Sequence, residues 1–340
     1  MEKPIILLKI KHYNKSSQKI KFALIFDHHI LLHGFIMLFD IPKIDYHILC
    51  DENHINKQLE LEKLKIAATE YGFLIIKNHP IKSKNIMNVF SIYKQFFNQS
   101  IKDKNKVNMS NTSSNRGWGG LRAEKVNKNF NFDYKEIFDC GPNINFKHKF
   151  EELTYYSKNI WPEQIPLFEK TIMSFYKSCE IISLSILKQI EISLNYSSNY
   201  FADKFNIPMS LLRCNYYPQR SQELSNKDFG IATHTDYGCL TLLFTNGTPG
   251  LEIELASKKW GEIIAKKNEI IVNFGDMLEI WSNKKIKATP HRVKVSNKER
   301  YSIPFFFNPQ YDTIISEENK ILAGQYLSEK YNSTYVHKIA

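Results

Sequence analysis

The stretch Ala232-Thr-His-Thr-Asp-Tyr-Gly-Cys-Leu-Thr-Leu-Leu-Phe-Thr245 joins two potential metal ligands to a short apolar run. His234 and Asp236 lie two residues apart, and residues at that spacing point to the same face of a β-strand. An imidazole and a carboxylate on one strand face can bind the same metal ion. The stretch therefore indicates a β-rich domain with a metal site on one of its strands.

The residues on either side extend this pattern. From about 210 to 308 the chain has short apolar runs separated by Gly, Asn and Pro, which is typical of about eight antiparallel strands in a jelly roll or cupin-like barrel. In the preceding region, apolar groups recur at helical spacing over 55–71, 83–98 and 161–194. Gly72 follows the first of these segments and is a signal for the end of a helix. The expected fold class is therefore α+β, mainly β.

The chain divides into four segments by these patterns. Residues 1–36 carry six Lys against two acidic residues and have no Arg. They lack the unbroken apolar core of a signal peptide, so we interpret them as an extension outside the domain. The remaining segments are a helical and mixed region (37–205), the barrel core (206–312) and a C-terminal helical segment (313–340).

Composition excludes several classes of protein. The net charge is +11, but the basic residues are mostly Lys scattered along the chain, which indicates a solvated surface rather than a nucleic-acid partner. No apolar run is long enough to span a membrane. The five Cys form no CxxC pair, which argues against disulfides and a thiolate zinc site. These features predict a cytoplasmic protein without a membrane or nucleic-acid partner.

A third ligand lies in Thr289-Pro-His-Arg-Val293, where His291 follows His234 by 57 residues. Two His and one carboxylate form the facial triad of non-haem iron(II) oxygenases. Three protein ligands on one face of an octahedron leave three positions open, two for a chelating co-substrate and one for O2. We expect His234, Asp236 and His291 to bind Fe(II).

Two further pairs of polar residues have the same i, i+2 spacing. Arg300 and Ser302 follow His291 on the next predicted strand. A buried guanidinium needs an anionic partner and fits a carboxylate with two parallel hydrogen bonds. A dicarboxylate that chelates iron at one end would place its other carboxylate there. Asn215 and Tyr217 also share a strand face and can hydrogen-bond an oxygen-rich ligand.

The chain resembles the iron/2-oxoglutarate oxygenases of the isopenicillin-N-synthase-like superfamily over about residues 38–336. The resemblance rests on motifs in a fixed order: Ile41-Pro-Lys-Ile-Asp45, Gly72-Phe-Leu-Ile-Ile-Lys-Asn-His79, Asp133-Tyr-Lys-Glu136, Asn215-Tyr-Tyr-Pro218, His234-x-Asp236, Pro249-Gly-Leu251, Gly275-Asp-Met-Leu278, Ser282-Asn283, Pro290-His-Arg-Val293 and Arg300-x-Ser302.

This resemblance implies a double-stranded β-helix core with flanking helices. It also implies a dioxygenase with Fe(II) as cofactor and 2-oxoglutarate and O2 as co-substrates, with no catalytic side chain beyond the metal centre. Arg300 and Ser302 would hold the distal carboxylate of 2-oxoglutarate, and Asn215 and Tyr217 match positions that contact it in some members. The small-molecule substrate would be hydroxylated, desaturated or cyclised, with release of succinate and CO2.

Three alternatives stay open at this point. One is an oxidase like isopenicillin N synthase, which does not use 2-oxoglutarate. That oxidase has a Gln near its C-terminus that occupies an iron position, and this sequence has no Gln after Gln325, which favours the 2-oxoglutarate users instead. Another is an ethylene- and succinate-forming enzyme. The third is a non-catalytic barrel that binds a ligand.

This chain departs from the residues common in the family at Pro80, Trp118 and Lys284. These positions lie where turns and substrate contacts differ between members of the family. These differences leave the metal and co-substrate groups intact. For the substrate contacts we expect the loop Arg116–Arg122 and the segment Tyr326–Tyr335. No pattern predicts an oligomeric state.

Overall fold

The computed structural model describes residues 41–112, 114–220 and 225–334, so the expected extension 1–36 lies outside the described residues. The main element is an eight-stranded sheet in which β2 pairs parallel with β1 and the other neighbours are antiparallel. Its strands in spatial order are β1 (Lys43–Asp45), β2 (Phe73–Lys77), β10 (Ile270–Phe274), β7 (Leu240–Thr245), β12 (Arg300–Phe307), β5 (Leu211–Tyr217), β4 (Glu136–Cys140) and β3 (Gly117–Gly119).

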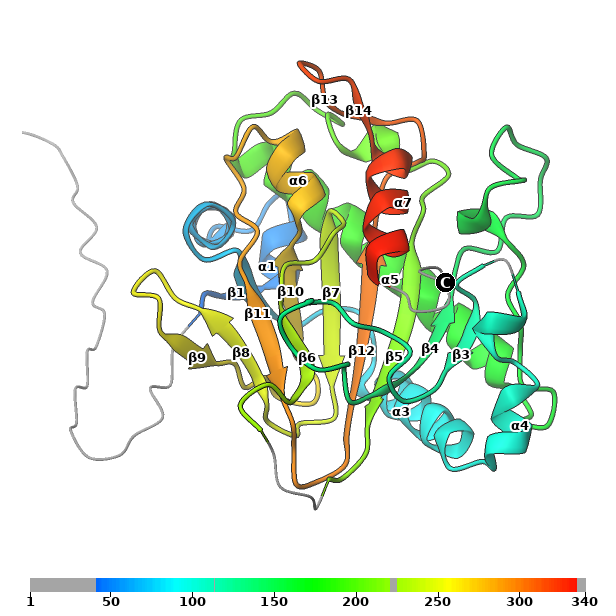
Figure 1. Ribbon diagram of the computed structural model, residues 1–340. Helices are drawn as coiled ribbons and strands as arrows, with labels where there is room; N and C mark the ends of the chain where they lie inside the picture. Colours follow the sequence, from blue (N-terminus) through cyan, green and yellow to red (C-terminus); the bar gives the residue numbers. More distant parts are fainter. Residues whose placement is uncertain (1–40, 113, 221–224, 335–340) are drawn as a thin grey trace, which may run out of the picture. The chain divides into compact units, whose positions relative to one another are not determined.

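A second sheet of four antiparallel strands completes the β-rich core (Figure 1). Because successive side chains alternate between the two faces of a strand, Leu74 and Ile76 pack with the helices, whereas Phe73 and Ile75 pack with residues of the smaller sheet. The strands of the smaller sheet in spatial order are β6 (Phe229–His234), β11 (His291–Lys294), β8 (Leu251–Glu254) and β9 (Trp260–Glu262).

Helices cover the outer face of the large sheet. The longest, α5, packs against β7 and β12, where Phe175 contacts Phe244 at 4.8 Å and Tyr176 contacts Phe305 at 5.0 Å between ring centroids. The helices are α1 (Tyr46–Cys50), α2 (Lys57–Ile66), α3 (Ser83–Phe97), α4 (Ile101–Asn105), α5 (Phe168–Ser193), α6 (Asp276–Trp281) and α7 (Ala323–Thr334), with a π-helical turn at Ala67–Tyr71 and 3-10 turns at Met109–Asn111, Thr154–Tyr156 and Ala202–Lys204.

Gly72 ends the helical segment predicted over 55–71 and directly precedes β2. Its φ is +69°, and a Cβ there would lie 2.4 Å from Thr289 Oγ1 and 2.6 Å from the Lys287 carbonyl oxygen. Only glycine satisfies both the left-handed backbone and this close approach. Gly72 thus brings β2 against the loop that leads to His291.

The fold class expected from the sequence is confirmed: two β-sheets form the core of the structure and helices flank it. Two boundaries differ. The long helix begins at Phe168 rather than near 161, because Leu167 adopts a left-handed conformation just before it. The segment expected to be helical from 313 first forms a two-stranded ribbon, β13 (Ile314–Ser316) and β14 (Ile321–Leu322), before α7 begins.

None of the helices in the described ranges has the length and apolar character needed to cross a membrane.

Candidate metal centre

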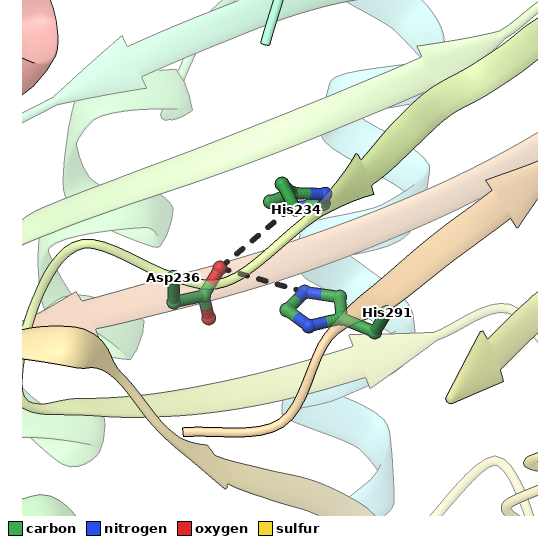
Figure 2. A group of neighbouring side chains, drawn as sticks. All are labelled: His234, Asp236 and His291. Atoms are coloured by element: carbon green, nitrogen blue, oxygen red, sulfur yellow. Dashed lines mark ion pairs between the residues drawn. The ribbon is translucent and has the colours of Figure 1, made fainter. Parts of the chain in front are cut away.

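Three potential ligands meet at the end of β6 and the start of β11. In Figure 2, Asp236 points toward both imidazoles. Its Oδ1 lies 3.8 Å from His234 Nε2 and 3.5 Å from His291 Nε2, and one ligand atom from each residue falls within 4.8 Å of the others. The antiparallel pairing of β11 with β6 explains why the two imidazoles are close, because His291 is the direct partner of His234. Strand pairing therefore brings the two imidazoles together, and Asp236 adds the carboxylate from the loop that follows β6.

Backbone carbonyls fix both imidazoles with Nε2 directed at the centre. His234 Nδ1 lies 2.8 Å from the carbonyl oxygen of Ala232, and His291 Nδ1 lies 3.1 Å from that of Thr289. A proton on Nδ1 donates to each carbonyl, so Nε2 keeps its lone pair for a metal. Phe73 packs edge-on against His291 at 5.4 Å between ring centroids and limits its rotation.

Hydrogen bonds to Oδ2 likewise fix the orientation of the Asp236 carboxylate. Its Oδ2 accepts hydrogen bonds from Thr241 Oγ1 at 2.6 Å and Asn273 Nδ2 at 2.7 Å, which leaves Oδ1 facing the two imidazoles. Thr241 lies on β7 and Asn273 on β10, and both are buried. Sequence reasoning did not identify these two residues. The one available signal was a polar side chain inside each otherwise apolar strand.

The acid–base properties of the triad follow from burial and mutual charge. Burial, reinforced by the neighbouring His291, lowers the pKa of His234 to about 3. Burial also opposes charge on His291, but its hydrogen bond to Asp236 raises the His291 pKa above 6.5. The same pairing holds the Asp236 pKa well below its usual range despite burial. Without metal, Asp236 therefore favours a proton on His291, whereas burial disfavours one on His234.

We expect the affinity for Fe(II) to decrease as the pH falls through the His291 pKa. Below that pKa, Nε2 carries a proton and cannot bind metal. Loss of one proton per metal bound predicts a decrease of about tenfold per pH unit. Anaerobic competition with a chromophoric chelator between about pH 5 and 8 measures this. An affinity that stays constant across the range would contradict it.

Arg300 and Ser302 line the same cavity as the triad, which has a volume of about 110 Å³. Arg300 is 1% exposed, and its Nε and Nη1 have no hydrogen-bond partner among the described residues. No ion pair within the described ranges includes it, although Arg213, Arg220 and Arg292 each pair with a carboxylate. A buried guanidinium with unused donors is costly unless an anion binds there.

Asn215 and Tyr217 pair directly with this group across β5 and β12. The register places Tyr217 opposite Arg300 and Asn215 opposite Ser302. The Tyr217 ring lies 4.8 Å from the Arg300 guanidinium carbon. Among the described residues the Ser302 hydroxyl has only long contacts, at 3.4 Å to Asn215 Nδ2 and 3.5 Å to Tyr217 Oη. The four sequence-predicted residues thus converge on one polar part of the cavity that also contains the triad.

A buried ion network forms another part of the wall. Glu124 accepts from Lys135 Nζ and Arg213 Nη1, each at 2.9 Å, and these cations lower its pKa to about 2 against the effect of burial. Lys135 also pairs with Asp133 at 3.0 Å. Asp133 accepts from the Ala232 backbone N–H, so the network supports the strand that carries His234.

The two predicted substrate segments differ in outcome. Leu327, Tyr331 and Thr334 of α7 line the cavity, within the expected segment Tyr326–Tyr335, of which Tyr335 lies outside the described residues. The loop Arg116–Arg122 does not line this cavity. Its residues Gly117–Gly119 form β3 at the sheet edge, and Glu124 and Val126 reach the cavity instead.

Comparisons with known proteins agree with this geometry. Residues 208–309 match the 2OG-Fe(II) oxygenase superfamily, and residues 41–164 match the family described as non-haem dioxygenase in morphine synthesis N-terminal. The chain is 29% identical over 301 residues to proline hydroxylase buaE of Petromyces alliaceus, covering 83% of this chain and 92% of that protein. It is 30% identical over 304 residues to the 2-oxoglutarate-Fe(II) type oxidoreductase ppzD of Metarhizium majus, covering 78% and 86%.

Among solved structures, that of a full-length Neurospora crassa protein in complex with alpha-KG is similar, with a TM-score of 0.74 and 26% identity. The likeness covers 85% of this chain and 95% of that one. Both the sequence matches and the structural likeness therefore extend over the sheets and the helices that flank them.

Proposed function

Because this chain belongs to the 2OG-Fe(II) oxygenase superfamily, we propose that His234, Asp236 and His291 bind its iron and that Arg300 and Ser302 bind its co-substrate. The chain is an Fe(II)- and 2-oxoglutarate-dependent dioxygenase. When bound, iron and 2-oxoglutarate supply the oxidising chemistry, in which O2 is consumed and succinate and CO2 are released as a substrate is oxidised.

The observation that carries the co-substrate assignment is the buried Arg300 guanidinium, whose Nε and Nη1 have no partner among the described residues. A guanidinium fork fits a carboxylate with two parallel hydrogen bonds, and the Ser302 hydroxyl adds a third donor. Because Arg300 lines the same cavity as the triad, a dicarboxylate can bind Arg300 at one end and face the metal ligands at the other. Tyr217 and Asn215 complete this polar part of the wall.

The backbone and side-chain groups around the triad then have defined tasks. Ala232 and Thr289 carbonyls hold the imidazole tautomers, while Thr241 and Asn273 orient the Asp236 carboxylate. Apolar residues, among them Leu243 and Leu251, also line the cavity and exclude water from it.

Replacement of Ser302 by Ala tests this assignment. Loss of one hydroxyl donor should raise the 2-oxoglutarate concentration for half-maximal succinate formation by about two- to tenfold, with unchanged iron affinity. Substrate-independent succinate formation by the Fe(II)-loaded protein is the measurement. Absence of any iron- and 2-oxoglutarate-dependent succinate from the wild-type protein would contradict the proposed function itself.

The substrate we propose is a small molecule, which is hydroxylated, desaturated or cyclised. The cavity volume of about 110 Å³ supports this, as do relatives named as hydroxylases of an amino acid, such as proline hydroxylase buaE and a homoarginine-6-hydroxylase of Glycine max. We place the protein in the cytoplasm, since its five cysteines are free thiols. Residues 206–312 would be the dioxygenase core, with 37–205 and 313–340 packed on it and 1–36 as an extension.

A further inference from the structure

A second, smaller cavity adjoins the main one near α7. It has a volume of about 10 Å³, the space that one water molecule or one ligand oxygen needs. Leu211 and Tyr331 line both cavities, so these two side chains form the boundary between them. Asn115, Arg116 and Ser210 supply its polar wall, and we call these three residues the Arg116 subsite.

Arg116 is a buried cation, 4% exposed, that makes no ion pair with any residue of the described ranges. Its Nη1 donates to the Asn115 carbonyl oxygen at 3.2 Å and its Nη2 to the Tyr155 carbonyl oxygen. Its Nε has no partner among the described residues. Two backbone carbonyls offset the desolvation cost of a buried guanidinium only in part, because it carries a full positive charge and carbonyls carry only partial charges. An anion at Nε would complete the compensation.

Two further polar groups at the same cavity are unused. Ser210 is 1% exposed, Asn115 is 6% exposed, and neither the Ser210 hydroxyl nor the Asn115 Oδ1 has a hydrogen-bond partner in the described part of the chain. The Ser210 hydroxyl donates, and the Asn115 amide presents either its oxygen or its nitrogen by rotation about Cβ–Cγ. Buried polar atoms are normally satisfied, so one unused polar atom on each of three residues that line the same small cavity indicates a ligand atom there.

We propose that the Arg116 subsite binds a carboxylate of the primary substrate, whose remainder lies in the main cavity beside Leu327 and Tyr331. This inference rests on the proposed function and names its substrate class: an organic acid with an apolar body. The subsite is distinct from Arg300, which binds the co-substrate. A cavity with space for one oxygen, lined by an arginine and a serine, fits an edge of a carboxylate better than the bulkier phosphate group.

Calorimetry with a matched pair of probes tests the proposal. Phenylacetate and phenylacetamide share an apolar ring and differ in charge. Each is titrated anaerobically into protein loaded with Fe(II) and saturating 2-oxoglutarate, which keeps the probe from Arg300. We expect the wild-type protein to bind the acid about tenfold or more tightly than the amide. Equal affinity for the two probes, or no measurable binding of the acid, would overturn the proposal.

Variants assign the preference to the subsite. Arg116→Gln should weaken binding of the acid about tenfold or more while leaving that of the amide within about twofold. Ser210→Ala, which keeps the guanidinium, should weaken the acid about threefold. Arg122→Gln, which removes an exposed guanidinium nearby, should change neither. An acid preference that survives in Arg116→Gln would mean that only water fills the cavity.

A separate titration with 2-oxoglutarate distinguishes this inference from the function on which it rests. Arg116→Gln should bind 2-oxoglutarate as the wild-type protein does, which also verifies that it folds. Failure of the wild-type protein to bind 2-oxoglutarate would contradict the proposed function, whereas a wild-type protein that binds 2-oxoglutarate but shows no acid preference would contradict the Arg116 subsite alone.

Discussion

Replacement of His291 by Ala is expected to abolish tight iron binding and turnover. The change removes one of three ligands from a site whose other two, His234 and Asp236, are held rigidly by their own hydrogen bonds. Because loss of a single outer hydrogen-bond partner commonly costs about 10- to 100-fold in metal affinity, loss of a ligand should cost more than about 100-fold. Iron content after anaerobic desalting and succinate formation are the two measurements.

His47→Ala is the matched control, because His47 is exposed on α1 and does not line the cavity. It should retain iron and activity. Tight iron binding or turnover retained by His291→Ala would refute the triad and require another ligand for the metal.

Replacement of Arg300 by Gln is expected to raise the 2-oxoglutarate requirement by roughly 30-fold or more, since removal of one partner of a buried charge pair costs about 2–5 kcal/mol. Arg300 is 1% exposed and its guanidinium lies over the Tyr217 ring. Bulk water therefore has little access to replace the lost guanidinium as hydrogen-bond donor to the carboxylate. Arg300→Lys keeps the charge but loses the two-point fork, and should have an intermediate effect. Titration of 2-oxoglutarate against succinate formation measures both.

Iron affinity serves as the control for this prediction, because the hydrogen bonds that orient His234, Asp236 and His291 come from other residues. It should be unchanged in both variants. A 2-oxoglutarate requirement close to that of the wild-type protein would mean that another group holds the distal carboxylate.

The metal and co-substrate residues were predictable because the period of a strand is local. The i, i+2 spacing of Arg300 and Ser302 places this pair on one face of β12, as predicted. The same prediction for His234 and Asp236 is wrong in part, because β6 ends at His234 and Asp236 lies two residues further on, in the loop that follows. Strand pairing then brings the pairs together, with His291 opposite His234 and Arg300 opposite Tyr217.

The residues that escaped prediction are those whose partners are distant in sequence. Thr241 and Asn273 reach Asp236 from β7 and β10, and neither spacing nor composition links them to it. The Glu124 network depends on a loop folding over β5, which no local pattern encodes. The ribbon before α7 was likewise missed, because its strands are only two or three residues long and too short to show a period.

The most direct test is the anaerobic visible spectrum of the purified apo-protein to which Fe(II) and then 2-oxoglutarate are added. Chelation of iron(II) by a 2-oxo acid at the triad should give a weak charge-transfer band, and Arg300→Gln should lose that band at the same 2-oxoglutarate concentration. Iron binding without a band would contradict the assigned co-substrate site, and failure of Fe(II) to bind at all would contradict the metal centre.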